Sequence, residues 1–215
     1  MATTGARTTT TARGDAAREA ILDAAFVRFS GYGLRRTSME DIAREARVSR
    51  ASIYFHFGSK DQVFRALAQR LHDQNLVAMR AAAAADGPVE VRIRGALEAR
   101  LGSFVELTHS SPHGDELLDE HNRVCGDIAA ASRDVALKIL RGLVRGATAA
   151  GELDPTTVGL SPTTAAAILL DCAEAAKTEP AVAPRAFRRR LEQIVRTLVA
   201  GMRPQAARAG VDSVS

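Results

Sequence analysis

The sequence predicts an all-α protein, and three observations support this fold class. Alanine, the residue with the highest helix propensity, is abundant, while aromatic residues make up 4% of the 215 residues and Trp is absent. Alternating runs of β-branched or aromatic residues, which would indicate strands, are missing. Apolar residues instead recur at intervals of three and four. The hydrophobic content of 46% is enough for one sizeable core, or for a small domain attached to a larger one.

The positive charge of the chain is concentrated in its first third. The formal net charge is +4, and residues 1–62 contain ten Lys and Arg against seven Asp and Glu. The remaining residues contain nineteen basic and eighteen acidic side chains. Such an excess suits a polyanionic partner without proving one.

Secretion, a disulfide scaffold and a membrane span are not indicated. The two cysteines, Cys125 and Cys172, are too few for a disulfide framework at this length. No apolar run approaches the roughly 20 residues that span a bilayer. The N-terminus, MATTGARTTTTARG, lacks the apolar segment of a signal peptide. We therefore expect a cytoplasmic protein.

Residues 1–13 are predicted to form a disordered tail, and the first helix to begin near Asp15, which can cap it. Arginines in and after this tail (Arg7, Arg13 and Arg18) could touch a phosphate backbone or minor groove. The alternative, a solvated tail, is the interpretation we favour. The first helix is expected to end at Gly31-Tyr32-Gly33, because glycine readily adopts the left-handed conformation of a helix stop.

Three helix starts follow one another within about 25 residues. Thr37 and Glu40 have the spacing of a capping box, and so do Ser59 and Gln62. Between them, Ser49 can cap a short helix. Short helices joined by tight turns are typical of a helix-turn-helix unit.

Longer helices are expected in the rest of the chain. They are predicted over 89–108, 115–150 with a bend or break near Gly126, 163–177 and 184–202. The loops between them are predicted at 110–114 and 151–162, and residues 204–215 are predicted to be disordered.

The stretch from Ile21 to Leu67 resembles the N-terminal domain of the tetracycline-repressor (TetR) family of transcriptional regulators. The matching residues are Ile21, Ala24-Ala25, Phe29, Gly31-Tyr32-Gly33, Thr37-Ser38-Met39, Asp41-Ile42-Ala43, Ala46, Val48-Ser49, Ile53-Tyr54, His56-Phe57 and Ser59-Lys60. The resemblance implies a helix-turn-helix DNA-binding domain over 14–74, then a larger helical ligand-binding and dimerisation domain over 75–203. It further implies a homodimeric repressor that leaves a palindromic operator when a small effector, which we expect to be apolar, binds the second domain.

The candidate recognition helix is Ser49–His56, which presents short polar and basic groups, while Ile53 and Phe57 can anchor it. Arg50 is the best candidate for a bidentate contact to guanine, with Ala51 placed to meet a thymine methyl. The full set of expected DNA contacts is Thr37, Ser38, Arg47, Ser49, Arg50, Ala51, Ser52, Tyr54, His56 and Lys60.

Several residues of this region could serve the fold alone. Ser49 and Ser59 can act purely as helix caps, Tyr54 can be a half-buried core residue, and His56 can be an ordinary surface histidine. By the resemblance, Tyr54, His56 and Lys60 reach phosphates, while Thr37 or Ser38 offers a hydroxyl and N–H groups to a phosphate at a helix start.

Arg47 departs from the family pattern, which has glycine in the turn before Val48. A left-handed backbone at this position would cost an arginine about 1 kcal/mol relative to glycine. Either the turn tolerates the arginine or its geometry shifts slightly, and a contact between Arg47 and a phosphate could offset the cost.

Candidate effector and dimer residues in the later helices are expectations from pattern alone. The expected effector pocket consists of Phe104, Leu107, His121, Cys125, Ile139 and Leu143. The expected dimer interface pairs the alanine-rich helix with the last one, through Ile168, Leu169, Cys172, Leu191, Ile194 and Leu198. The alternative is that these two helices pack only within one chain.

Metal binding and catalysis are weaker interpretations. His121 and Cys125 are four residues apart on one helix face, but no third ligand lies close in sequence, and no metal or other cofactor is expected. The sequence has no phosphate-binding glycine loop, nucleophile elbow or HExxH pair, so an enzyme is not expected. The carboxylates of Asp115, Glu116, Asp119 and Glu120 are interpreted as a solvated helix start.

Overall fold

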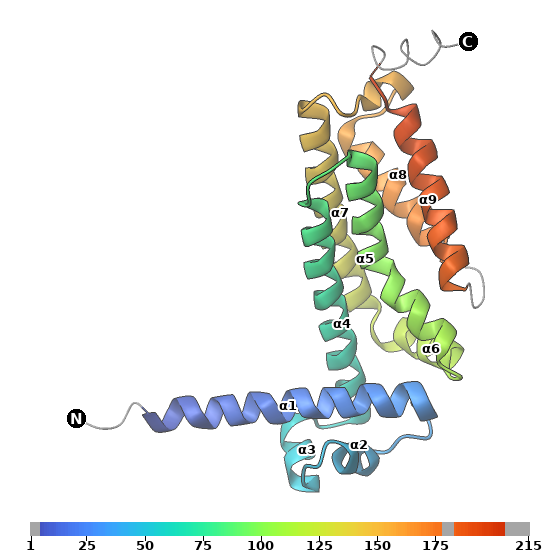
Figure 1. The fold of residues 1–215 in the computed structure, drawn as a ribbon. Helices are drawn as coiled ribbons and strands as arrows, with labels where there is room; N and C mark the ends of the chain where they lie inside the picture. The colour runs from blue at the N-terminus through green and yellow to red at the C-terminus, as the bar shows by residue number, and fades with distance from the viewer. Residues whose placement is uncertain (1–4, 178–182, 205–215) are drawn as a thin grey trace. The chain divides into compact units, whose positions relative to one another are not determined.

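The computed structural model describes residues 5–177 and 183–204, with side chains described from Gly14 onward. Helices account for all regular structure in this part of the chain, so the all-α prediction is confirmed. The elements, shown in Figure 1, are α1 (Gly5–Tyr32), α2 (Met39–Glu45), α3 (Arg50–His56), α4 (Lys60–Ala83), α5 (Val89–Ser110), α6 (Gly114–Val124), α7 (Gly126–Ala149), the 3₁₀ turn η1 (Pro155–Val158), α8 (Pro162–Ala175) and α9 (Pro184–Gly201).

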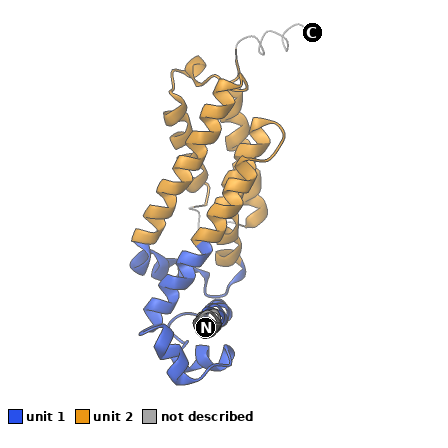
Figure 2. Ribbon diagram, turned by 90° about the vertical axis from the view of Figure 1, so that its left-hand side faces the viewer, with its two compact units in different colours: residues 1–71, 110–126 blue, residues 72–109, 127–215 orange. Residues whose placement is uncertain are grey.

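Two compact units make up the chain (Figure 2). The first comprises residues 1–71 and 110–126, and the second comprises 72–109 and 127–215. The chain enters the second unit within α4, close to the domain boundary expected after residue 74. It then returns to the first unit with α6, which the sequence did not predict.

The start of α1 differs from its prediction. The helix begins at Gly5, so Asp15 lies inside it and does not cap it. The predicted tail over 1–13 therefore overlaps α1, while residues 1–4 and the side chains of Arg7 and Arg13 lie outside the described part. The helix ends as expected, because Gly33 has φ +80° and donates its N–H to the carbonyl of Phe29 at 3.0 Å.

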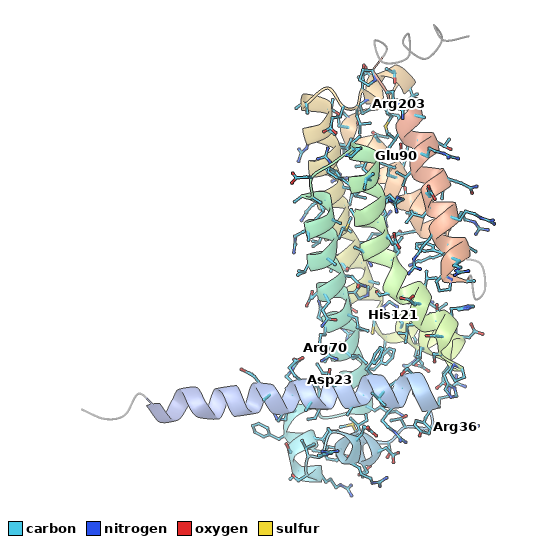
Figure 3. All side chains as sticks on the ribbon, viewed as in Figure 1. Asp23, Arg36, Arg70, Glu90, His121 and Arg203 are labelled. Carbon is cyan, nitrogen blue, oxygen red and sulfur yellow. The ribbon has the colours of Figure 1, made fainter. Side chains whose placement is uncertain are left out.

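The first unit has a core built by the N-terminal helices. Phe29 of α1 and Phe64 of α4 meet edge to face with ring centroids 5.7 Å apart. At its edge, the Arg70 guanidinium lies 2.8 Å from the Asp23 carboxylate; both residues are labelled in Figure 3. The remaining fully buried side chains of this core include Ile21, Leu22, Ala25, Ile42, Ile53 and Val63.

The second unit contains the longer helices and one continuous apolar core. Leu97 and Leu101 of α5, Leu140 of α7 and Leu169 of α8 are almost completely buried in it. The predicted helix over 115–150 is divided at Cys125 into α6 and α7, in agreement with the break expected near Gly126. Within the described residues, no helix is both long enough and apolar enough to cross a membrane. Of the tail predicted over 204–215, residues 205–215 lie outside the described part of the chain.

Candidate nucleic-acid interface

The N-terminus of α2 is capped by Ser38. Its hydroxyl oxygen accepts the N–H of Asp41 at 3.1 Å, while the Asp41 carboxylate accepts the N–H of Ser38 at 3.0 Å. The predicted capping box of Thr37 and Glu40 is therefore wrong by one residue. Hydrogen bonds from the Ser38 hydroxyl and N–H hold the pKa of Asp41 below its ordinary value of 3.8, so this carboxylate is ionised at neutral pH.

Thr37 cannot act as the expected phosphate contact. Its side chain is 1% exposed, and its hydroxyl donates to the carbonyl of Gly33 at 2.7 Å. The residue instead closes the loop between α1 and α2. A phosphate at Ser38 would face the ionised Asp41, which makes Ser38 a poorer phosphate contact than its position in the sequence suggests.

The turn between α2 and α3 has a left-handed residue at Arg47, with φ +56°. No other non-glycine among the described residues has a positive φ. The Arg47 N–H bonds to the Arg44 carbonyl at 3.2 Å and the Val48 N–H to the Ala43 carbonyl at 3.0 Å, which is a Schellman helix stop. Of the two alternatives that the sequence left open, the structure has the first: the turn tolerates the arginine in the left-handed conformation that favours glycine.

Helix α3 is capped and anchored as expected. The Ser49 hydroxyl oxygen accepts the Ser52 N–H at 3.1 Å, which confirms Ser49 as the cap. Ile53 is 0% and Phe57 5% exposed, so both belong to the core of the first unit. Because these two residues face inward, the opposite side of α3 is exposed and can contact a partner.

The outward side of α3 presents Arg50, Ala51 and Tyr54. Arg50 lies 3.2 Å from the Glu40 carboxylate and 5.6 Å from the centroid of the Tyr54 ring. Both partners of this ion pair are well exposed, so the pair is weak and Arg50 can exchange it for DNA. Tyr54 is 42% exposed and is not a core residue. Ser52 and His56 are half-buried at the margin of the same surface.

Phe55 is a surface residue that was not among the DNA contacts expected from the sequence. Its ring is 84% exposed, the highest value among the exposed large apolar side chains, and lies 5.2 Å from the His56 ring. The sequence held a signal for it, because Phe55 falls between the two anchors Ile53 and Phe57 and so cannot face inward with them. An exposed aromatic ring on this helix can pack against thymine methyl groups or sugars.

Lys60 is engaged inside the first unit. Its ammonium donates to the carbonyls of Leu34 at 2.7 Å and Thr37 at 2.9 Å. These bonds join the start of α4 to the loop between α1 and α2, and they leave one N–H for another acceptor. Ser59 caps α4 as expected, but the Gln62 side chain accepts the Gly58 N–H at 2.8 Å, so the capping box predicted for Ser59 and Gln62 is incomplete.

Helix α6 packs on the end of α1 within the first unit. The Glu116 carboxylate accepts the Arg35 N–H at 2.7 Å, and the Ser111 hydroxyl donates to the Ser30 carbonyl at 2.8 Å. A Cβ at Gly33 would lie 2.5 Å from Glu116 Oε2, so glycine is required there for space as well as for its positive φ. Glu116 is therefore a structural anchor, and its interpretation as a solvated acid is wrong.

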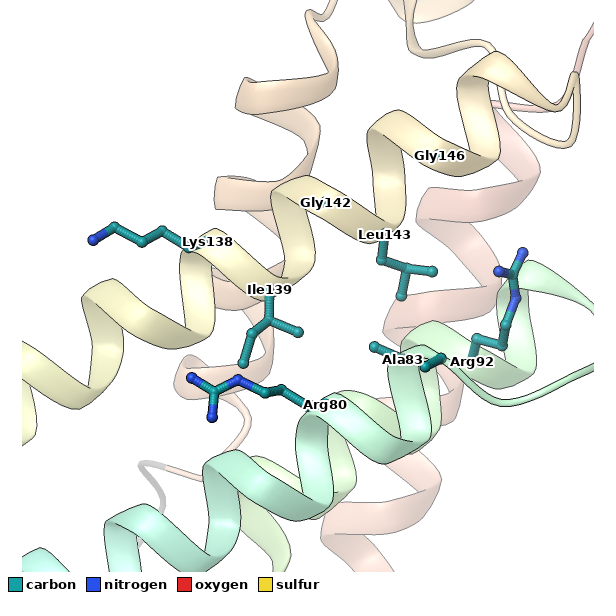
Figure 4. A pocket seen from close by; sticks show the side chains of 9 residues that line it. Arg80, Ala83, Arg92, Lys138, Ile139, Gly142, Leu143 and Gly146 are labelled. Carbon is teal, nitrogen blue, oxygen red and sulfur yellow. The ribbon is translucent and has the colours of Figure 1, made fainter.

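The residues expected to form the effector pocket are distributed over both units. Ile139 and Leu143 line a groove of about 380 Å³ between α4, α5 and α7 in the second unit (Figure 4). Phe104 and Leu107 belong to the same unit but do not line this groove. His121 and Cys125 belong to the first unit.

The expected dimer residues divide into two groups. Leu169 and Leu191 are 0% exposed in the core of this chain, so they cannot form an interface. Ile168, Cys172, Ile194 and Leu198 are half-buried and remain accessible. Ile168 and Leu198 also line a shallow apolar depression of about 200 Å³ on α8 and α9.

A metal site at His121 and Cys125 gains no support from their surroundings. In the described part of the chain, no three His, Cys, Asp or Glu side chains are grouped so that they could hold a metal ion. His121 and Cys125 are thus not joined by a third candidate ligand.

Comparisons with known proteins agree with this geometry. The family model for bacterial regulatory proteins of the tetR family matches residues 21–67. The chain is 30% identical over 152 residues to the HTH-type transcriptional regulator SrpR of Pseudomonas putida. This alignment covers 67% of each chain. It is 32% identical over 97 residues to the repressor LfrR of Mycolicibacterium smegmatis, covering 44% of this chain and 50% of that one.

The fold is similar to those of solved regulators. SmeT, the repressor of the Stenotrophomonas maltophilia multidrug efflux pump SmeDEF, superposes with a TM-score of 0.64 at 23% identity, over 87% of this chain and 91% of that one. A TetR-like regulator of Rhodococcus sp. RHA1 has a TM-score of 0.56 at 25% identity, over 86% of this chain and 96% of that one. Regulators of this kind are not enzymes. Helix α3 is capped, anchored and exposed on one face, and the chain matches SrpR over two thirds of its length. This chain therefore belongs to the TetR family of DNA-binding transcriptional regulators.

Proposed function

We propose that the protein is a homodimeric repressor that binds a palindromic operator and leaves it when a small molecule binds the second unit. The observation that carries this proposal is the division of α3 into two sides. Ile53 and Phe57 are buried in the first unit, while Arg50, Tyr54 and Phe55 are exposed. A helix held in this way can enter a major groove without disturbing its own domain.

Each exposed residue of α3 has a proposed role on DNA. Arg50 reads guanine through two parallel N–H donors, and Ala51 and Phe55 contact thymine methyl groups or sugars. Tyr54, His56 and Arg47 contact the backbone and set the register of the helix. Ser49 acts first as a cap, because its hydroxyl oxygen already accepts the Ser52 N–H.

Dimerisation follows from the small size of one α3. A single helix-turn-helix makes few base contacts, so tight and specific binding is reached when two copies read two half-sites. Repression and release by an effector are consistent with the relatives. SrpR is named a transcriptional regulator and LfrR a repressor, and SmeT has been solved as a complex with triclosan. Release requires the effector to bind the DNA-incompetent arrangement more tightly than the DNA-bound one.

The test compares Arg50→Ala with a control, Arg145→Ala, which removes an exposed arginine of α7 in the second unit. The operator is first recovered from fragmented genomic DNA by binding to the wild type. We expect Arg50→Ala to weaken operator binding by about 1–3 kcal/mol while binding to unrelated duplex falls much less. Arg145→Ala should change neither affinity. Equal losses on both DNAs would make Arg50 a phosphate contact, and failure to recover any operator would contradict the proposed function.

A further inference from the structure

Arg100 of α5 is the one charged residue that is buried among the residues the structure describes, with 6% of its surface exposed. Its Nε makes no hydrogen bond, and none of its nitrogens has a hydrogen bond or ion pair to a described residue. A guanidinium has five N–H donors and is always charged. Burying it without partners is strongly unfavourable, so its place in a core calls for a function.

A second cation, Lys177, lies near Arg100, just after the end of α8. Its ammonium is 5.0 Å from the centroid of the Phe104 ring of α5. Burial lowers the pKa of Lys177 and the charge of Arg100 lowers it further, while the Glu174 carboxylate acts in the opposite direction. Burial is also the main cause of the lowered pKa of Arg100. A buried guanidinium with a second cation nearby favours an anion that can contact both.

The Glu174 carboxylate acts favourably on both cations, but it is shared with a third, Arg133. Glu174 accepts the Arg133 Nε–H at 3.0 Å, and Arg133 also pairs with Asp171. This region therefore has three cations (Arg100, Lys177 and Arg133) and two carboxylates (Glu174 and Asp171). Both carboxylates are bound by Arg133. The unmatched positive charge remains at Arg100 and Lys177, and it corresponds to one monovalent anion.

We propose that Arg100 and Lys177 bind the carboxylate of an organic acid, which is the effector class of this regulator. The guanidinium can donate two parallel N–H bonds to the carboxylate oxygens, and the ammonium can donate a third. The Phe104 ring supplies apolar surface for the body of the ligand. This inference rests on the proposed function, since it identifies the effector that the second unit would take.

The groove in Figure 4 is a less suitable anion site, although three basic residues line it. Its Arg92 is already paired with Glu152 at 2.5 Å. Its other two basic residues, Arg80 and Lys138, are exposed and so remain hydrated. Arg100 is more buried than these residues and has no ion pair among the described residues, so its charge is less well compensated.

The first measurement needs no ligand. Arg100→Met replaces an unpaired buried charge with an apolar side chain, so we expect the Tm of the ligand-free protein to rise. The matched control is Arg188→Met, which removes an exposed arginine of α9 that pairs with Glu98 at 2.8 Å; its Tm should not rise. A marked fall in the Tm of Arg100→Met would mean that other contacts hold Arg100, and would count against the proposal.

The second measurement uses octanoate and phenylacetate, each compared with its own amide and amine by thermal shift and calorimetry. The acids should bind the full-length protein at least about tenfold more tightly than the amides and amines. That preference should disappear in both Arg100→Met and Lys177→Met and persist in Arg188→Met. The proposal is overturned if neither acid binds, if amides or amines bind equally well, or if Arg100→Met keeps the preference.

The two proposals can fail separately. If the acids bind at Arg100 but do not displace the operator, the acid site stands and effector-induced release is wrong. If a neutral or cationic compound releases the operator from a protein that binds neither acid, the regulator stands and the acid site is wrong.

Discussion

Arg47 shows how a single residue ends α2 and directs the chain into α3. Its φ of +56° allows the two hydrogen bonds that stop α2 and direct the chain into α3. In an L-residue with a side chain this conformation brings Cβ close to the backbone. The protein therefore keeps a mildly unfavourable backbone at the turn beside α3, the helix proposed to read DNA.

Replacing Arg47 with glycine tests this interpretation. We expect Arg47→Gly to raise the free energy of unfolding by up to about 1 kcal/mol, and Arg47→Val to lower it, because a β-branched residue tolerates positive φ poorly. Urea unfolding followed by circular dichroism gives both values. The control, Glu45→Gly, places glycine within α2 and should lower stability by roughly 1 kcal/mol. If Arg47→Gly is less stable than the wild type, the arginine side chain stabilises the fold by more than its left-handed backbone destabilises it.

At the scale of elements, α6 is the feature that sequence distance conceals most. Its Glu116 accepts at 2.7 Å the N–H of Arg35, which lies 81 residues earlier in the chain and just before α2. The same side chain lies beside Gly33 and 3.7 Å from His113. The loop that leads into the helix-turn-helix is thus held by a helix from a distant part of the chain.

Glu116→Gln removes the charge of this anchor and leaves its shape. We expect the free energy of unfolding to fall by about 1 kcal/mol, because a charge-assisted hydrogen bond becomes a neutral one. Hydrogen exchange at Arg35 should become faster for the same reason. Asp119→Asn, which neutralises an exposed carboxylate on the same helix, is the control and should change neither. If the two variants behave alike, the Arg35–Glu116 bond does not hold the loop.

At the scale of the whole molecule, the proposed dimer needs an apolar surface that one chain leaves uncovered. The depression on α8 and α9 lined by Ile168 and Leu198 is such a surface. Leu169 and Leu191, on the same helices, are used inside the chain. The two helices can therefore serve the core on one side and a second copy on the other.

Leu198→Glu tests the dimer directly. A carboxylate on this surface would be buried without a partner in the dimer, so we expect a monomer by sedimentation and roughly tenfold or weaker operator binding. Val77→Glu introduces the same charge at a 64% exposed apolar residue of α4 in the same unit, and it should leave the assembly unchanged. A dimer that survives Leu198→Glu would place the interface elsewhere.

The sequence by itself determined the features that depend on neighbours along the chain. Helix periodicity predicted the helical fold, Ser49 and Ser59 marked two helix starts, and the spacing of Ile53 and Phe57 identified the buried side of α3. The match of ordered residues also identified Arg47 as the position where the family has glycine, but it left open whether the turn keeps a left-handed backbone there. These features involve interactions within a few residues, which spacing records.

Only the tertiary structure decided which polar groups are already engaged. Thr37 and Lys60 have the residue types of phosphate contacts, but backbone carbonyls inside the first unit bind them. Glu116 has the sequence context of a solvated acid and is an anchor, while Arg100 has that of a surface arginine and is buried. Thr37 binds Gly33 within the same loop, but the partners of Lys60 and Glu116 come from segments more distant in sequence. Burial and hydrogen bonding between such segments follow from packing of the whole chain, and local spacing holds no record of them.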